Sequence, residues 1–240
     1  MKLQFLGRGG AFLVEEGNTA AYFIEGETLF LIDCGETVFG RIVQLDLLKK
    51  NHIKEINCFI THMHSDHVGS LSSLIYYCGL IDVSNPIAFH LVCPDALRND
   101  LLPMLKSQGC IDYFDFVSPD SLSGKYQSFI EVRFIRTIHQ WIFPAFSIEF
   151  ITHSGKIFYS GDTKDLGLIR SYIRQDAVIE RMYIEVTTLD YPDNVHLSLK
   201  GLGKTIPANF QHKVYLMHFN CKECIAKAQE LGFQVVECVK

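Results

Sequence analysis

The feature that most constrains the fold is a group of four polar side chains placed directly after a short apolar segment. In "INCFITHMHSDHVG", His62, His64, Asp66 and His67 fall within six positions. The apolar residues 56–60 predict a short buried strand, and polar groups at its end cost free energy unless they find partners. Imidazole and carboxylate groups are common metal ligands. The segment therefore predicts a metal site at the end of a strand rather than an ordinary polar turn.

Strand-like and helix-like segments alternate along the rest of the chain. Strands are expected over 129–138, 156–160, 213–217 and 234–239, and a helix is expected over 40–51. No repeat or linker rich in Pro, Gly and Ser interrupts this order, so we expect a single domain over 1–240. Alternation of this kind, with some strands paired as hairpins, predicts a layered α/β protein with two mixed sheets and outer helices.

Charge and composition exclude some classes of protein. A net charge of −5 argues against a broad non-specific nucleic-acid surface, although it allows a small phosphorylated substrate. No apolar run reaches the length of a membrane span, and the N-terminus lacks the pattern of a signal peptide. Eight cysteines without a secretory leader favour reduced thiols and a cytoplasmic location.

Three further metal-binding side chains follow other predicted strands. They are His139, Asp162 and His218. Ligands of such sheets bind beyond the carboxyl ends of the strands, so these residues can meet the first group. A catalytic metal takes about three protein ligands and leaves a position open for water. Seven candidates thus suit two divalent ions, zinc or manganese, with one set from His62, His64 and His139, a second from Asp66, His67 and His218, and Asp162 as a bridge.

Such a centre suits a particular chemistry. Two divalent ions, two carboxylates and a hydroxide would leave a small net positive charge, which matches a singly charged phosphodiester and its transition state. Metal binding lowers the pKa of a bound water to roughly 7. We expect Asp66 to help orient or deprotonate that water.

The motif and its later partners resemble the metallo-β-lactamase-fold hydrolases. The similarity covers nearly the whole chain, from "FLGRGGAF" through "LIDCG" and "THMHSDH" to "SGDT" and "LMH". It implies an αββα sandwich. Thiolester hydrolases and lactonases of this superfamily usually carry "HTPGHT" at the third ligand, where this chain has "IHQWIFPAF". "YSGDT" and "YIEVTTLDYPDNVHLSLKGL" are instead similar to the branch of ribonuclease Z and small cyclic-phosphate phosphodiesterases.

The resemblance to that branch also implies roles for two further residues. Glu185 would orient His196, and His196 would bind the phosphate and protonate the leaving oxygen. The usual "HEAT" of the branch is "IEVT" here, with Ile184 in place of its histidine. Only 22 residues separate His139 from Asp162, which leaves no room for the tRNA-gripping arm of ribonuclease Z. The similarity therefore implies hydrolysis of a small phosphodiester, of which a cyclic phosphate and a nucleotide are two forms. Relatives of this branch are often dimers, so the similarity also implies a homodimer.

Three alternatives stay open at this point. The protein could be an RNA 3′-processing endonuclease, a lactone or thioester hydrolase, or a module that binds a nucleotide without cleaving it. A redox or zinc role for Cys221 and Cys224 is a weaker reading than helix packing, because a C-x-x-C without a second pair is a poor signal. Trp141 and Phe143 could line a wall that stacks on a base, or they could pack in the core.

Overall fold

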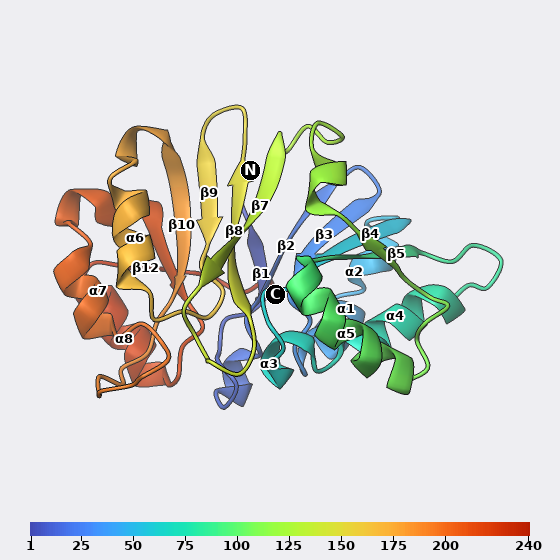
Figure 1. The fold of residues 1–240 in the computed structure, drawn as a ribbon, viewed down its shortest axis with the longest axis horizontal. Helices are drawn as coiled ribbons and strands as arrows, with labels where there is room; N and C mark the ends of the chain where they lie inside the picture. Colours follow the sequence, from blue (N-terminus) through green and yellow to red (C-terminus); the bar gives the residue numbers. More distant parts are fainter.

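Two six-stranded β-sheets face each other between two layers of helices, in a computed structural model that describes residues 1–240 (Figure 1). This αββα sandwich is the predicted fold. The first sheet has the order β1 (Gln4–Gly7), β2 (Ala20–Glu25), β3 (Thr28–Ile32), β4 (Glu55–Phe59), β5 (Ala88–Val92) and β6 (Asp115–Val117). The second has the order β12 (Gln234–Val235), β11 (Val214–Met217), β10 (Ile179–Glu185), β9 (Lys156–Tyr159), β8 (Ala145–Ile151) and β7 (Glu131–Thr137).

Both sheets are mixed, and each begins with an antiparallel part. Strands β1 to β3 pair antiparallel and β3 to β6 pair parallel. In the second sheet, β7 to β9 pair antiparallel and β9 to β12 pair parallel. The strands β7, β9, β10 and β11 therefore run in the same direction, so their carboxyl ends share one edge of the second sheet; in Figure 1 the arrows of β9 and β10 point to the lower side of the sandwich.

Alternating side chains of the strands fill three hydrophobic layers. In β3, Leu29 and Leu31 pack toward the helices, whereas Phe30 and Ile32 point into the space between the sheets. Phe59 and Phe150 meet there edge to face across the two sheets. A period of two residues is what a strand with two buried faces requires.

Helices cover the outer face of each sheet. The first sheet packs against α1 (Val38–Gln44), α2 (Leu47–Lys50), α4 (Leu71–Leu80) and α5 (Asp95–Ser107). The second packs against α6 (Leu166–Ile173), α7 (Leu199–Thr205) and α8 (Lys222–Glu230). The remaining elements are α3 (Ser65–Val68) and the short 3-10 helices η1 (Val14–Glu16), η2 (Pro119–Leu122), η3 (Asp176–Val178) and η4 (Ala208–Lys213). No helix is both long and apolar enough to cross a lipid bilayer.

Two predicted elements differ from the structure. The helix expected over 40–51 is divided into α1 and α2, because Asp46 takes a left-handed backbone with φ 52°. The strand expected over 234–239 is regular only at Gln234–Val235. Beyond it the backbone changes partner: the Val236 amide donates to Leu216 in the second sheet, and the Val239 amide donates to Phe5 in the first. The segment therefore links the two sheets instead of extending one.

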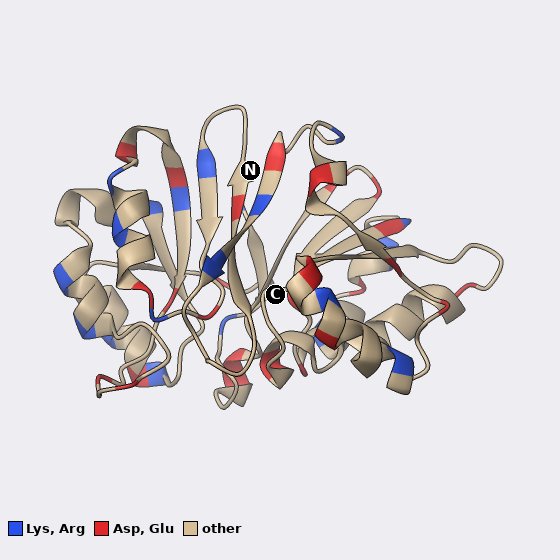
Figure 2. Ribbon diagram, viewed as in Figure 1, with Lys and Arg blue, Asp and Glu red and all other residues tan.

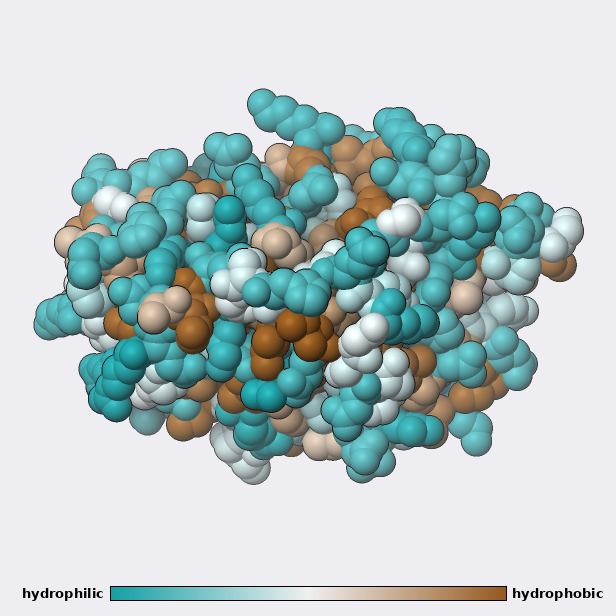
Figure 3. All heavy atoms as spheres, turned by 90° about the horizontal axis from the view of Figure 1, so that it is seen from above, coloured by the Kyte–Doolittle hydropathy of each residue, from teal (hydrophilic) through white to brown (hydrophobic).

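Figures 2 and 3 show where charged residues lie along the ribbon and how hydropathy varies on one face. Lys and Arg are spread over helices and strands of both halves (Figure 2). Seen from above, hydrophobic residues form several small groups separated by hydrophilic ones (Figure 3). In Figure 2 the Lys and Arg residues are not gathered on one element.

Candidate metal centre

The seven predicted ligands all lie at the ends of strands on one edge of the sandwich. His62 follows β4, and His64, Asp66 and His67 come from the start of α3 and the residue before it. His139 follows β7, Asp162 follows β9 and His218 follows β11. Six of the seven side chains are buried, and His64 is half-buried. The structure thus brings residues separated by more than 150 positions into one cluster.

The first group contains three imidazoles and one carboxylate. His62 Nε2 and His139 Nε2 lie 3.0 Å and 3.2 Å from His64 Nδ1. Asp162 Oδ2 lies 3.7 Å from His62 Nε2 and 3.8 Å from His139 Nε2. Four nitrogen atoms bound tetrahedrally to zinc at about 2.0 Å would lie roughly 3.3 Å apart, so these separations fit a cation among the rings.

The second group lies on the other side of Asp162. His218 Nε2 is 3.1 Å from Asp66 Oδ2, and His67 Nε2 is 3.5 Å from the same oxygen. Asp162 Oδ1 lies 3.3 Å from His67 Nε2 and 3.4 Å from His218 Nε2. One oxygen of Asp162 therefore faces each group, which is the geometry that a carboxylate needs to bridge two ions.

Two buried atoms in this cluster lack a hydrogen-bond partner. They are His67 Nε2 and Asp162 Oδ1. Buried polar atoms without a partner are rare, and each one calls for an explanation such as a bound ion. The two atoms lie 3.3 Å apart, and both belong to residue types that bind zinc, manganese or iron. The residues present therefore fit a pair of divalent ions.

Several ligands are held through their second ring nitrogen. His67 Nδ1 lies 2.8 Å from Asp33 Oδ2, and His139 Nδ1 lies 2.9 Å from the Val195 carbonyl. Both acceptors place the proton on Nδ1 and leave the Nε2 lone pair directed into the cluster. Asp33 also accepts hydrogen bonds from the Thr61 amide and hydroxyl, each at 2.8 Å.

Asp33 is a site residue that the sequence analysis did not identify. The signal was present, since this carboxylate directly follows a fully buried strand in "LIDCG". Its backbone is left-handed, with φ 63°, which an aspartate tolerates better than most residues. The same positive φ occurs at His218, at 56°. Both residues turn the chain at the end of a strand, so that the side chain is aimed into the site.

The protonation states of the three imidazoles in the first group suit metal binding. Burial lowers the pKa of His139 to about 4 and also lowers the pKa values of His62 and His64. These rings are therefore neutral at pH 7, the form in which histidine binds a metal.

In the second group, burial disfavours charge on His67 and His218, but nearby carboxylates, chiefly Asp162, outweigh it and raise both pKa values. Metal binding there would therefore displace protons. Burial alone would raise the pKa of Asp66, but His67 and His218 lower it, so the carboxylate is ionised.

Beside the cluster, the buried Glu185 pairs with the half-buried His196. Glu185 is the last residue of β10, and His196 lies in the loop between β10 and α7. His196 Nδ1 is 2.8 Å from Glu185 Oε2 and 3.8 Å from Asp162 Oδ2. Burial disfavours the charged imidazole, yet the Glu185 carboxylate outweighs it and raises the pKa of His196 to about 9. His196 is consequently protonated at neutral pH.

A cleft of about 600 Å³ opens onto this edge of the sandwich. The metal-side groups His64, Asp66, Asp162 and His218 form its floor, together with Glu185 and His196. Its other walls come from the turn after β1, the loop after β10 and three single residues, Glu36, Ser65 and Asn220. No Lys or Arg side chain lines the cleft.

The relationship to known proteins agrees with this geometry. A family model described as "Anti-Pycsar protein Apyc1" matches residues 1–238. The chain belongs to this family. The Apyc1 protein of Paenibacillus sp. (strain J14) is 31% identical over 230 residues, which cover 92% of this chain and 89% of that protein. A ribonuclease Z of Halorubrum lacusprofundi is 30% identical over 152 residues, which cover 58% of this chain and 44% of that enzyme.

Solved structures confirm the metallo-β-lactamase fold of this Apyc1-family protein. The metallo-β-lactamase fold protein YhfI of Bacillus subtilis superimposes with a TM-score of 0.69 at 16% identity, covering 99% of this chain and 95% of that one. The short form of human tRNase Z gives 0.68 at 21% identity, covering 99% and 96%. A diphosphatase from the PhnP family gives 0.67 at 14% identity, covering 99% and 95%.

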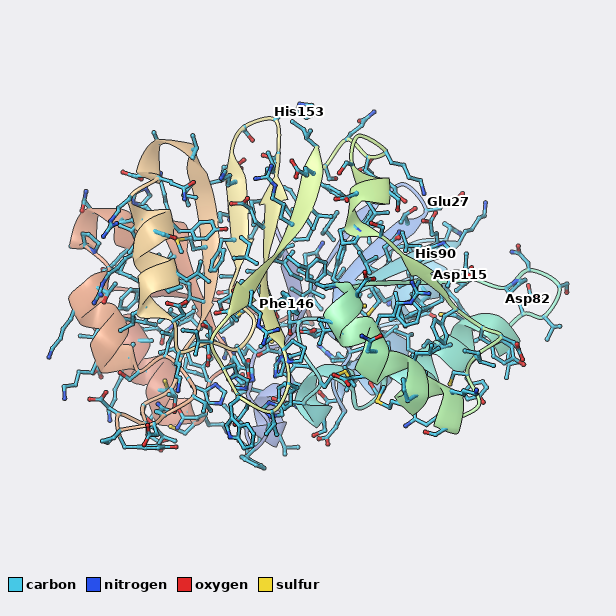
Figure 4. All side chains as sticks on the ribbon, in the orientation of Figure 1. Glu27, Asp82, His90, Asp115, Phe146 and His153 are labelled. Carbon is cyan, nitrogen blue, oxygen red and sulfur yellow. The ribbon has the colours of Figure 1, made fainter.

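Other residues considered from the sequence lie outside the cluster in this Apyc1-family protein. Trp141 is exposed, and Phe143 packs with its ring 4.8 Å from that of His64; neither lines the cleft. Cys224 is buried on α8 and Cys221 precedes the helix, with no metal-binding group around them. The remaining histidines, His52, His90, His153 and His212, belong to none of the metal-binding groups, and Figure 4 shows His153 at the far end of the β8–β9 hairpin.

Proposed function

We propose that this Apyc1-family protein is a dinuclear metal-dependent phosphodiesterase that hydrolyses a small cyclic phosphodiester. The observation that carries the proposal is the arrangement of Asp162, whose two oxygens each face one group of imidazoles, with His196 directly beside it. Zinc or manganese held by the seven ligands would supply Lewis acidity and a bound water of lowered pKa. The remaining tasks fall to side chains of the chain.

Two of these side chains would handle protons. Asp66 borders both the second group and the cleft, so its carboxylate can orient the attacking water. His196 carries a proton at neutral pH and faces the cleft, which suits it to protonate the leaving oxygen. Glu185 fixes the ring of His196 through Nδ1, and the Thr163 amide in turn donates to Glu185. This is the order of contacts expected of a general acid and its positioning residue.

Turnover assays with matched variants test the proposal. His64→Ala should lose both bound metal and activity, because its Nδ1 faces two other imidazoles. His196→Ala should keep its metal and lose about 10²- to 10⁴-fold in kcat, the usual contribution of a general acid. His153→Ala, at an exposed turn, is the control and should match the wild type. Metal content is measured by elemental analysis and kcat with bis-p-nitrophenyl phosphate and cyclic nucleotides.

The same assays separate the alternatives. Turnover of a lactone or thioester alone would replace the phosphodiesterase, and recovery of an intact nucleotide after long incubation would favour a binding module. Normal kcat in His196→Ala would contradict its role as the acid. An RNA 3′-processing endonuclease remains the second candidate, supported by similarity to a protein named ribonuclease Z, whereas the absence of basic residues in the cleft supports the small substrate.

Three broader proposals accompany this one. A hydrophobic layer shared by both sheets supports a single domain over 1–240. All eight cysteines are free thiols, which supports a cytoplasmic location. Similarity to a branch that contains many dimers supports a homodimer, which light scattering of the purified protein would test.

A further inference from the structure

Two exposed aromatic side chains belong to the lining of the cleft. Phe12 is 96% exposed and Tyr191 is 56% exposed, and both line the cleft with the metal-side groups. They come from separate segments, the turn after β1 and the loop after β10. Leu189 and Val195 extend the same wall. An exposed apolar surface that rims a polar site is typical of a ligand-binding surface.

Backbone contacts hold the turn that carries Phe12 against the predicted metal ligand His218. In the turn that carries Phe12, the Gly10 amide donates to the Phe219 carbonyl at 2.9 Å, and the Leu13 amide donates to Gly10 at 3.2 Å. A side chain at Gly10 would come within 3.1 Å of the His218 ring. The turn therefore packs directly on His218, one of the predicted metal ligands, and this contact holds the turn that carries Phe12 at the edge of the site.

The loop that carries Tyr191 is tied to His196 through one asparagine. Asn194 Nδ2 donates to the Leu189 carbonyl at 2.8 Å, and the Asn194 amide donates to the Tyr191 carbonyl at 3.2 Å. The same Asn194 accepts from the His196 amide through Oδ1. Tyr191 and the proposed acid are thus parts of one hydrogen-bonded loop, which holds Tyr191 in position relative to His196.

The charges around the cleft limit what can occupy it. Its lining contains no Lys or Arg, so His196 and the metal pair would be the only cations that meet a substrate. Glu36 adds a further negative charge beside Ser65. The nearby lysines Lys200, Lys204 and Lys227 line a different cavity between α7 and α8. A second or third phosphate would find no partner in the cleft, whereas a neutral flat ring would find an apolar wall.

We propose that Phe12 and Tyr191 determine specificity by stacking on an aromatic ring joined to a singly charged phosphodiester, as in a nucleoside cyclic monophosphate. This inference rests on the phosphodiesterase proposed above. Phe12 and Tyr191 touch the substrate without taking part in the chemistry. They act on binding of the ring, and the metal-side groups act on the phosphate.

The test compares two substrates that differ only in the ring. One is a nucleoside 3′,5′-cyclic monophosphate, and the other is its abasic counterpart, the methyl riboside 3′,5′-cyclic phosphate. Phe12→Ala and Tyr191→Ala should each lower kcat/KM for the nucleotide by roughly 5- to 100-fold, the range for loss of one base–aromatic stack. Both variants should turn over the abasic compound like the wild type. Tyr191→Phe should retain the nucleotide preference.

A control and two further measurements complete the experiment. Trp141→Ala removes an aromatic side chain that is 93% exposed but lies outside the cleft, and it should leave both substrates unaffected. Calorimetry with a non-hydrolysable phosphorothioate analogue should show the same loss of affinity as kcat/KM in the alanine variants. Light scattering should give every variant the mass of the wild type.

The outcomes are distinct. Equal losses on both substrates, or no loss on either, would overturn the assignment of Phe12 and Tyr191. A change of mass in Phe12→Ala would show instead that this side chain holds another copy of the chain, and would also overturn it. Absence of turnover of both compounds by the metal-loaded wild type would contradict the proposed phosphodiesterase itself, which is a separate failure.

Discussion

Asp33 connects three side chains of the site although it faces neither the cleft nor the substrate. Its Oδ2 lies 2.8 Å from His67 Nδ1 and from the Thr61 hydroxyl, while Oδ1 accepts from the Thr61 amide. Thr61 Oγ1 in turn lies 3.1 Å from His62 Nδ1. One buried carboxylate therefore orients ligands of both predicted metal groups. Partners of this kind are a large part of what sets metal affinity.

Replacing this carboxylate by an amide tests its role. Asp33→Asn would put an NH₂ group opposite donors that now meet an acceptor, so metal affinity should fall by about 10- to 100-fold. Chelator competition measures the affinity. Asp46→Asn is the matched control, because Asp46 is also left-handed but is exposed and makes no capping hydrogen bond. Equal affinity in the two variants would show that Asp33 only supports the fold.

At the scale of elements, the segment after β3 and the helix α3 approach each other closely. A Cβ built on Gly35 would lie 1.9 Å from the carbonyl oxygen of Asp66. The Cys34 amide donates to the His67 carbonyl at 2.7 Å in the same region. Only glycine leaves space for this approach. The position of the α3 ligands therefore depends on the absence of a side chain at Gly35.

Two substitutions of glycine by alanine test whether the close contact at Gly35, rather than the loss of a glycine as such, matters for stability and metal binding. Gly35→Ala should destabilise the fold by about 1–3 kcal/mol or more, because the new methyl group forces backbone apart, and should weaken metal binding. Gly40→Ala in α1 has nothing within 4 Å and should be neutral or stabilising by up to about 1 kcal/mol. Urea unfolding measures both. A stable, metal-binding Gly35→Ala would show that α3 can shift without cost.

The sequence allowed prediction of those parts of the site and fold that depend on local pattern. The four residues from His62 to His67 share one short segment, and the strands before His139 and His218 have clear apolar runs. The contact of Asp33 with His67 joins residues 34 positions apart, so no local pattern reports it. The division of the expected helix into α1 and α2 depends on the left-handed backbone of the single residue Asp46. Phe12 and Tyr191 line the same cleft only after both sheets have packed together.

For the molecule as a whole, the predicted metal centre joins the two sheets. His62 and the α3 ligands extend from the first sheet, whereas His139, Asp162 and His218 extend from the second. Ions bound there would therefore hold the two halves of the sandwich together at one edge. Binding to the folded state alone must add to stability.

Removal of metal should consequently lower the melting temperature. Free metal at 100 times Kd contributes about 2.7 kcal/mol per site, and treatment with a chelator should remove that contribution. Calorimetry before and after chelation, and again after metal is restored, measures the change. His64→Ala provides the comparison, since it should melt at a lower temperature and respond less to the chelator. An unchanged melting temperature in the wild type would contradict metal binding by both sheets.

The lack of basic side chains in the cleft has a consequence for how a ligand arrives. Two divalent ions would bring the formal charge of −5 close to neutrality. The long-range electrostatic attraction between the protein and an anion would then be very weak. The attraction would be confined to the floor of the cleft, within a few ångströms, where mobile salt screens little. Encounter would then be set by ordinary diffusion, and capture would proceed at nearly the same rate in dilute buffer and in concentrated salt. Enzymes that bind a nucleic-acid strand lose affinity steeply as salt is added. The dependence of kcat/KM on ionic strength would therefore distinguish a small substrate from a nucleic acid.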